Sequence, residues 1–300
     1  MKLCTTTKDF ADYCSSDIDR IKEVARVGFK YIDYSMISNE AAAYMHSGWR
    51  DNVKRLKEEA DKLGVSFLQM HSPEFETLET LDPDENWDEK LAQTLRTIEI
   101  AGELGIKSTV VHAGIKRYTD WEETKRLNKK FYELLLPTME KTGVNVLVEN
   151  VGKADNTGRC FLNTGARVRE FVEYFDHPLL HACWDLGHGN VFPNQADEMK
   201  IVGEHIYAIH FNDNFGDTRD MHTIPFLGNG EHAKNLRILI EIGFNGPLTF
   251  ECVFVAQPGL REFDRALGRE GDSIEIKRAY ERVMFETGKY MLESFGVYEE

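Results

Sequence analysis

Apolar and polar residues follow one another along this chain in blocks that repeat a single local pattern. A charged, amphipathic stretch of helical period ends at a glycine, and an apolar residue, a short β-rich run and a polar residue follow. Glycine at that point is typical of a helix C-cap, because it tolerates a left-handed backbone. The pattern is clear in ARVGFKYIDYS (25–35), DKLGVSFLQMHS (61–72), GELGIKSTVVHAG (102–114), EKTGVNVLVEN (140–150) and EIGFNGPLTFE (241–251).

Three further strands are predicted where the full pattern is missing. They are LCTTT at the start, LLHACWDLGH (179–188) after a helix near 165–175, and HIYAIHFND (205–213) after a helix near 195–203. Runs such as TVVHA, NVLVE and YAIHF are short and almost continuously apolar, as expected of parallel strands that are covered by helices. Strands that alternate with helices indicate repeated βαβ units.

Eight such units predict one closed (β/α)8 TIM barrel, an α/β fold, as a single domain over residues 1–300. An open, doubly wound sheet is the alternative, but no GxGxxG turn follows the first strand. Long helices are expected near 87–104, 120–141 and 273–294. We expect the last of these to pack outside the barrel as a C-terminal helical extension.

Charge and cysteine content narrow the class of function. The chain carries a net charge of −15, without a clustered Lys/Arg face, which disfavours a nucleic-acid partner and favours a small-molecule substrate. The five cysteines form no CxxC pair, so neither a disulfide framework nor a thiolate zinc site is indicated. With no apolar run of membrane-spanning length and no signal-peptide pattern, we expect a cytoplasmic protein that does not contact a membrane.

Ionisable residues stand where the predicted strands end, which is where barrels of this kind build their active sites. These residues are His71, His112, Glu149, Asp185 with His188, His210 with Asp213, and Glu251. Burying a carboxylate directly after an apolar run is costly unless a cation or hydrogen bonds compensate for it. Three convergent carboxylates and His210 therefore predict a divalent-metal site that suits Mn²⁺, Mg²⁺ or Co²⁺, with Zn²⁺ also compatible.

Several short motifs in this order resemble the xylose-isomerase-like TIM barrel superfamily. They are VENVG (148–152), DLGH (185–188), IHFND (209–213), LGNGEH (227–232) and FE (250–251). The similarity covers almost the whole chain and is to the sugar phosphate isomerase/epimerase group, which includes ketose 3-epimerases, inosose-processing enzymes and hydroxypyruvate isomerases.

The resemblance implies specific roles for individual residues. Glu149, Asp185, His210 and Glu251 would bind the metal, with Mn²⁺ the ion we expect first, and Glu149 and Glu251 would form the acid/base pair. The expected reaction is proton abstraction beside the carbonyl of a sugar or polyol ketone, through a metal-stabilised enediolate, giving epimerisation or isomerisation. Substrate contacts are expected from His188, His112, His71 and Arg219. Members of such families often form homo-oligomers, which we expect here by analogy.

Two alternatives remain open. The zinc-dependent apurinic endonucleases, which share this barrel, bind three zinc ions and hydrolyse phosphodiesters, and their pattern adds the candidate ligands His71, His112, His188, Asp220 and His222. The acidic net charge argues against that activity. The second alternative is a metal-dependent lyase or dehydratase acting on a keto-sugar, an inosose or a keto-C-glycoside, since NVGKADNTGRC (150–160) differs from the corresponding loop of ketose 3-epimerases.

Overall fold

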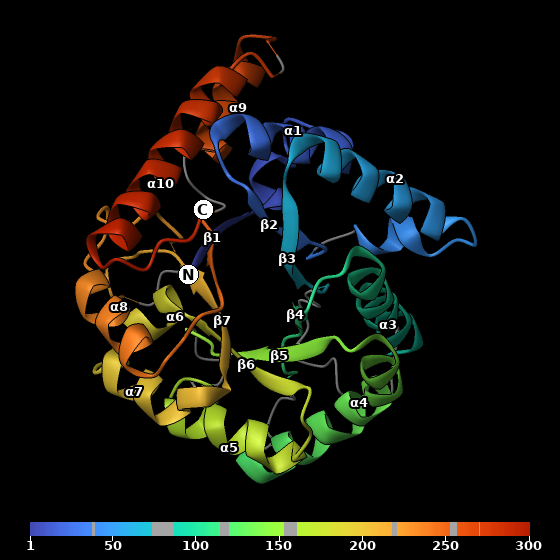
Figure 1. Cartoon of the computed structure of the whole chain (residues 1–300), viewed down its shortest axis with the longest axis vertical. Helices are drawn as coiled ribbons and strands as arrows, with labels where there is room; N and C mark the ends of the chain where they lie inside the picture. The colour runs from blue at the N-terminus through green and yellow to red at the C-terminus, as the bar shows by residue number, and fades with distance from the viewer. Residues whose placement is uncertain are drawn as a thin grey trace.

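Eight parallel strands form a closed barrel in the computed structural model of the chain (Figure 1). The structure describes residues 1–37, 40–73, 87–114, 120–152, 161–217, 221–252, 257–269 and 271–300. Each strand pairs with the next, and β8 pairs with β1 through the register Leu3–Leu248, which closes the ring. The strands are β1 (Lys2–Thr6), β2 (Tyr31–Ser35), β3 (Ser66–His71), β4 (Ser108–Val110), β5 (Asn145–Glu149), β6 (Leu180–Asp185), β7 (Ile206–Phe211) and β8 (Pro247–Phe250).

Helices surround the strands as an outer layer (Figure 1). The α-helices are α1 (Asp17–Val27), α2 (Trp49–Leu63), α3 (Trp87–Leu104), α4 (Trp121–Thr142), α5 (Gly165–Phe175), α6 (Leu186–Asn190), α7 (Gln195–Val202), α8 (His232–Glu241), α9 (Gln257–Ala266) and α10 (Ile274–Ser294). Short 3-10 turns η1 (Thr7–Phe10), η2 (Ala41–Tyr44) and η3 (Gly203–His205) complete the described elements. None of the described helices is long and apolar enough to cross a membrane.

The glycine-ended pattern of the sequence corresponds to real helix ends. Gly28, Gly64 and Gly143 are C-caps with φ of 115°, 68° and 68°. Gly105 directly follows α3 with φ of 79°, and Gly243 follows Ile242, the C-cap of α8, with φ of 75°. A side chain at these positions would be strained, so the sequence pattern fixes where each helix turns back toward its strand. The predicted eight-stranded barrel is confirmed.

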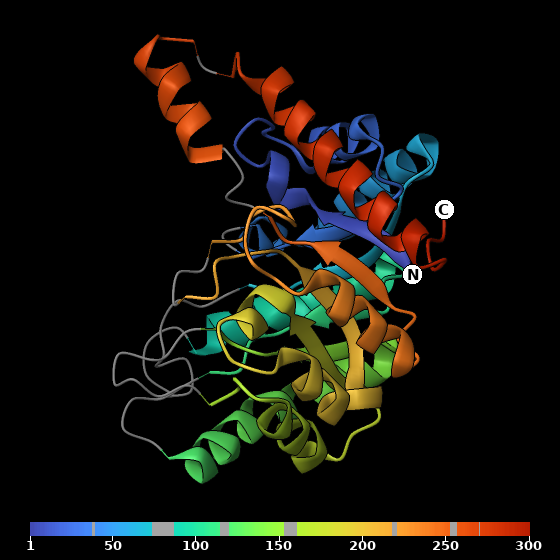
Figure 2. The same cartoon turned by 90° about the vertical axis from the view of Figure 1, so that its left-hand side faces the viewer.

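The C-terminal helix expected near 273–294 is present as α10 and lies against α1 and β1. An ideal Cβ at Gly288 would lie 2.7 Å from the Phe250 ring and 2.8 Å from a Leu3 methyl carbon, so α10 approaches the barrel closely there. The sequence did not indicate α9, which separates β8 from α10 and stands away from the barrel in Figure 2.

Apolar side chains fill the layer between strands and helices, whereas the strands also bury polar side chains. Val110, Leu147, Cys183 and Ala208 form a small apolar cluster separate from the main core. Polar residues of the strands, among them Asp33, Gln69 and Thr249, are also buried. The strand ends therefore lie next to an interior that holds both buried polar side chains and a small apolar cluster.

Candidate metal centre at the strand ends

Five strands carry ionisable side chains to one end of the barrel. His71, Glu149 and Asp185 are the last residues of β3, β5 and β6. His210 is the penultimate residue of β7, and Glu251 directly follows β8. Register pairs Asp185 with His210, so these two side chains start at the same level of the sheet. The closed barrel brings together residues that lie far apart in the sequence.

The first group consists of the four predicted metal ligands Glu149, Asp185, His210 and Glu251. One ligand atom from each lies within 4.8 Å of all the others. His210 Nδ1 is 3.0 Å from Glu149 Oε1 and 3.1 Å from Glu251 Oε2. Glu251 is the most exposed of the four, with 12% of its side chain accessible, against 1% for Glu149. Glu251 is therefore the carboxylate of the two that a molecule at the strand ends reaches more easily.

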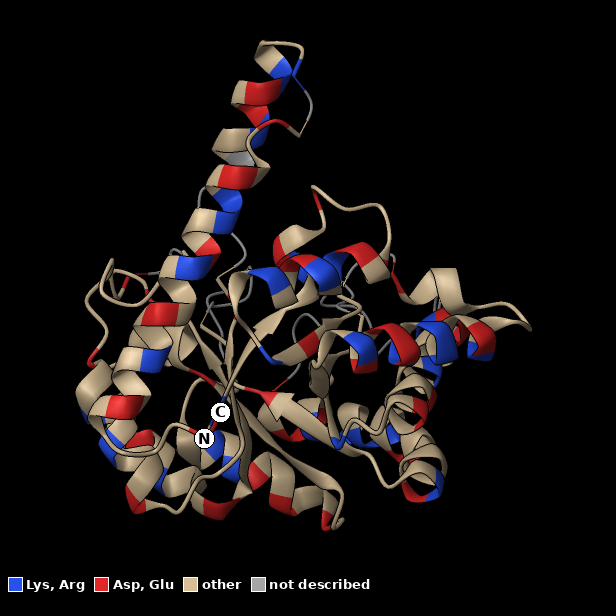
Figure 3. Cartoon of the chain, turned by 45° about the horizontal axis from the view of Figure 1, so that its top comes forward, with Lys and Arg blue, Asp and Glu red and all other residues tan. Residues whose placement is uncertain are grey.

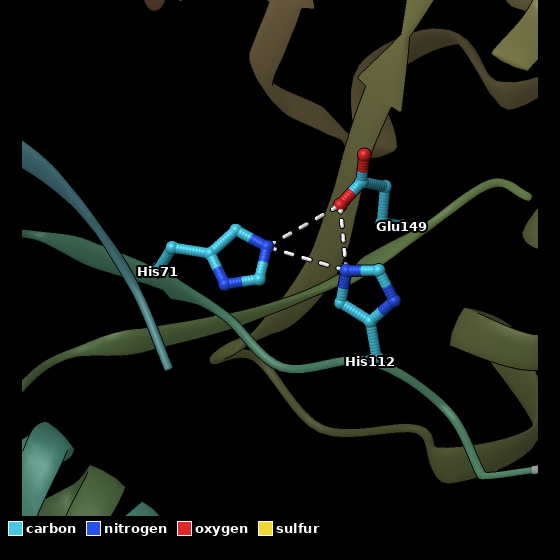
Figure 4. Close-up of side chains that lie close together, drawn as sticks. All are labelled: His71, His112 and Glu149. Atoms are coloured by element: carbon cyan, nitrogen blue, oxygen red, sulfur yellow. Dashed lines mark hydrogen bonds and ion pairs between the residues drawn. The ribbon is translucent and has the colours of Figure 1, made fainter. Parts of the chain in front are cut away.

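A second group joins Glu149 to His71 and His112 (Figure 4). His112 Nε2 lies 3.1 Å from Glu149 Oε2 and 3.2 Å from His71 Nε2. His71 Nε2 is 3.7 Å from the same carboxylate oxygen. The two oxygens of Glu149 thus face different groups, Oε1 toward His210 and Oε2 toward the two histidines.

A third group contains Asp185, His188 and His222. His188 Nδ1 is 3.8 Å from Asp185 Oδ1, and His222 Nδ1 is 2.7 Å from the backbone oxygen of Glu251. The backbone of His222 has a positive φ of 40°, a conformation that non-glycine residues seldom adopt, and its side chain lies in this group. Asp185 belongs to both this group and the first, as Glu149 belongs to the first and second.

Two predicted site residues, Arg219 and Asp220, lie outside the described residues. All the other predicted ligands and substrate contacts lie in the three groups.

The acidic and basic groups of the centre shift one another's pKa. Burial opposes ionisation of Glu251, but the His210 charge and hydrogen bond outweigh burial and lower its pKa to about 2. Burial also opposes ionisation of Glu149, yet His210, His112 and His71 hold its pKa well below the ordinary value. For His71, burial is outweighed by Glu149 and Glu251, which raise the pKa to about 8. Glu149 and Glu251 are therefore ionised at neutral pH and are stabilised by nearby positive charge, whereas burial raises the pKa of Asp185.

The donor set fits divalent cations. Ligand atoms that share an ion at bond lengths of about 2.0–2.2 Å lie about 2.9–3.6 Å apart in octahedral or tetrahedral geometry. His210 Nδ1 lies 3.0 Å from Glu149 Oε1 and 3.1 Å from Glu251 Oε2, which is within this range. The 3.2 Å between the Nε2 atoms of His71 and His112 also falls within it. A cation would take over the stabilisation of the carboxylates that protonated histidines otherwise provide.

Amide side chains hold Asp185 in place, a role that the sequence did not indicate. Asn212 Nδ2 donates to Asp185 Oδ2 at 2.7 Å, and Asn150 bonds to the backbone N–H and carbonyl of Asp185. Asp185 Oδ1 accepts from the His188 N–H at 2.6 Å as the N-cap of α6. Both asparagines directly follow a strand-end position, in VEN and HFN, and this spacing was the available signal.

Asp213 also stands just past a strand end, but its carboxylate holds a loop in place. It accepts from the backbone N–H groups of Asn214, Phe226, Gly228 and Gly230 and from His232. An ideal Cβ at Gly228 would lie 2.1 Å from the Asn214 carbonyl oxygen, so the loop needs glycine there. The G-x-G element of the sequence therefore serves to close this loop on Asp213.

Comparisons with known proteins support the architecture. The family model described as "Xylose isomerase-like TIM barrel" matches residues 21–267. A D-psicose 3-epimerase structure from Clostridium cellulolyticum H10, solved with D-tagatose, is 15% identical with a TM-score of 0.74, covering 97% of this chain and 99% of that one. A 3-keto-D-glucoside 4-epimerase from E. coli is 16% identical with a TM-score of 0.69, covering 93% and 99%. The IolI protein, solved with a zinc atom, is 19% identical with a TM-score of 0.70, covering 93% and 99%. A search of curated protein sequences found no match.

Proposed function

Because the chain belongs to the xylose isomerase-like TIM barrel family, we propose that its strand-end centre makes it a metal-dependent sugar isomerase or epimerase. The observation that carries the proposal is the group of Glu149, Asp185, His210 and Glu251, whose ligand atoms lie within 4.8 Å of one another. The similarity in fold to proteins described as ketose and keto-glucoside epimerases supports a ketone or ketose substrate.

The proposed metal ligands are the four residues of that group, and the ion we favour is Mn²⁺. Carboxylate oxygens with one imidazole nitrogen form a hard, mixed set that Co²⁺, Mg²⁺ and Zn²⁺ also suit. A bound divalent ion would supply a Lewis acid that polarises the substrate carbonyl and acidifies the neighbouring C–H.

Glu251 and Glu149 are the proposed proton-transfer pair. Glu251 accepts the proton from carbon, since it is ionised at neutral pH and is the more accessible of the two. Glu149 approaches from β5, separated from β8 by two strands of the barrel, and so from another side of the centre. In epimerisation, Glu149 takes a proton from solvent through His112, 3.1 Å away, and delivers it to the opposite face of the same carbon, while Glu251 releases its proton to solvent. In isomerisation, Glu251 returns its proton to the neighbouring carbon, and the hydroxyl hydrogen passes between the two substrate oxygens.

His188 is the proposed contact for substrate oxygens. Its Nδ1 lies 2.8 Å from the Asn150 carbonyl, which fixes the ring, and 13% of the side chain is accessible. A donor held at this point can orient a hydroxyl or carbonyl group.

The variant Glu251→Gln tests this assignment. We expect it to lose at least about 100-fold of the rate of deuterium incorporation from D₂O into ketose substrates, the scale typical of a lost acid/base group. The matched control is Glu241→Gln at the end of α8, where the carboxylate pairs with Lys200 and is 60% exposed. Exchange by Glu251→Gln at the control rate, measured by NMR with Mn²⁺ present, would refute the role of Glu251.

A second candidate function is favoured by the two additional histidine groups. His71 and His112 with Glu149, and His188 and His222 with Asp185, provide more ligands than one ion needs. A centre of two or three ions suits phosphodiester hydrolysis by activated water. Metal analysis separates the two: one ion per chain supports the isomerase, and three zinc ions support the phosphodiesterase.

A lyase or dehydratase shares the first half of the proposed mechanism and differs in the second. After a proton leaves carbon, elimination of a neighbouring hydroxyl or glycoside requires an acid, which His188 or His112 would supply. The NMR experiment above distinguishes this reaction, because elimination gives an unsaturated product whereas epimerisation gives a labelled isomer.

A further inference from the structure

Gln69 lies beneath the metal centre and connects opposite parts of the barrel interior. It belongs to β3, is completely buried, and faces the same side of the strand as His71 two residues later. Its amide reaches His210 of β7, with Nε2 to Nε2 at 2.6 Å, and its oxygen accepts from the Thr249 hydroxyl of β8 at 3.2 Å. These partners are 141 and 180 residues away in sequence.

The Gln69 amide touches the nitrogen of His210 that points away from the centre. Nδ1 of the same ring faces Glu149 Oε1 at 3.0 Å and Glu251 Oε2 at 3.1 Å, so Nδ1 is the atom offered to a cation. When the lone pair of Nδ1 binds a cation, the single ring hydrogen of a neutral imidazole must be on Nε2. That Nε2–H is buried, and a buried donor without an acceptor destabilises the fold.

The side-chain amide of Gln69 has both a donor and an acceptor, so it can pair with Nε2 of His210 whether or not that nitrogen carries a hydrogen. With its nitrogen toward His210, Gln69 can donate to Nε2 whenever that ring nitrogen carries no hydrogen. A half turn of the amide exchanges nitrogen and oxygen without changing its shape, so the oxygen accepts from Nε2–H. After such a turn the amide nitrogen faces the Thr249 hydroxyl. The hydroxyl can then accept from the amide instead of donating to it, because a hydroxyl group does both.

We propose that Gln69 is a positioning residue for His210, whose amide turns with the ring tautomer so that Nδ1 is free to bind the metal ion. This inference rests on the proposed metal-dependent function. Gln69 acts through His210, and Thr249 completes the network. Residues that hold a ligating histidine through its second nitrogen commonly contribute 10- to 100-fold to metal affinity.

The test is the Mn²⁺ dissociation constant of Gln69→Met, measured by calorimetric titration of the full chain. Methionine has nearly the same length and no hydrogen-bonding amide, so it preserves packing while removing the partner of Nε2. We expect about 10- to 100-fold weaker binding. The matched control is Gln93→Met, at another buried glutamine, which bonds to Glu89 on α3 away from the centre. We expect the control to bind Mn²⁺ as the unmodified chain does.

Two further measurements keep the inference testable if Gln69→Met folds poorly. Thr249→Val removes the hydroxyl that is hydrogen-bonded to the Gln69 amide, and we expect Mn²⁺ affinity to fall by about tenfold or less. In the chain loaded with diamagnetic Zn²⁺, we expect a ¹⁵N NMR spectrum to show the His210 hydrogen on Nε2. Hydrogen on Nδ1 in the loaded chain, or binding by both variants within twofold of the control, would overturn the inference. If the unmodified chain bound neither ion, the proposed function itself would fail.

Discussion

Asp33 is a buried carboxyl group on β2 whose Oδ1 accepts no hydrogen bond among the described residues. Burial is the largest influence on it and raises its pKa to about 6, although the charges of His210 and His71 act in the opposite direction. The folded chain therefore keeps a proton on Asp33 at a pH where the unfolded chain has lost it. Binding of this proton contributes fully to the free energy of unfolding below pH about 4. The contribution is lost as the pH rises through about 6.

The variant Asp33→Asn is predicted to be more stable than the unmodified chain above pH 6. The gain should grow from about zero at pH 4 to at most about 3 kcal/mol near pH 7, since one pKa unit corresponds to about 1.4 kcal/mol. Urea unfolding of both metal-free proteins at several pH values measures it. A difference between the two proteins that does not change with pH would show that Asp33 is not protonated in the folded chain.

For single residues, the sequence predicted the candidate metal ligands better than the residues that hydrogen-bond to them. Glu149 and Glu251 each end an apolar run, so their identity could be read from the local pattern. Side chains alternate between the two faces of β3, which places Gln69 on the same face as His71. Closure of the barrel brings β7 and β8 to the other side of the interior from β3. Contacts across the barrel, such as Gln69 to His210, therefore could not be predicted from local sequence.

Among the elements, the helices that end at glycine were the most predictable, because one residue with positive φ decides each end. Two of the α-helices in the described part of the chain were not predicted. The short α6 begins where the Asp185 side chain caps it, and this capping cannot be distinguished in sequence from metal binding. The amphipathic α9 exposes 65% of Phe263, Leu267 just past its end is 50% exposed, and little of the helix packs on the barrel.

The close approach of α10 to the barrel predicts opposite effects for two glycine substitutions. Gly288→Ala should lower the free energy of unfolding by about 1–3 kcal/mol, because the new methyl group would press on Phe250 and Leu3. In α9, the new methyl group of Gly259→Ala meets no atom of the described residues within 4 Å, so this variant should be neutral or stabilising by up to about 1 kcal/mol. Urea unfolding measures both. Equal effects would show that α10 does not pack on β1 and β8 as described.

The charge of the whole molecule separates the two candidate functions. The chain has 51 acidic and 36 basic residues, and Figure 3 shows the two signs interspersed along the outer helices. A nucleic-acid backbone is held by concentrated positive charge, so this distribution disfavours it.

We therefore predict that the chain loaded with Zn²⁺ does not cleave a duplex oligonucleotide containing one abasic site at low salt. Gel electrophoresis of the labelled oligonucleotide measures this, with metal content determined on the same sample. Efficient cleavage by a chain that holds three zinc ions would make phosphodiester hydrolysis the function, and His71, His112, His188 and His222 would then be metal ligands.

The central claim is that the strand-end centre moves a proton at a carbon beside a carbonyl with the help of a divalent ion. Its most direct test is solvent deuterium exchange by the full chain in D₂O, measured by NMR over a panel of ketoses, inososes and keto-glycosides, with Mn²⁺ and after chelation. We predict exchange into at least one of these ketones with Mn²⁺ and a loss of exchange after chelation that added Mn²⁺ restores. Exchange unaffected by chelation, or no exchange into any of the ketones with Mn²⁺ bound, would contradict the claim.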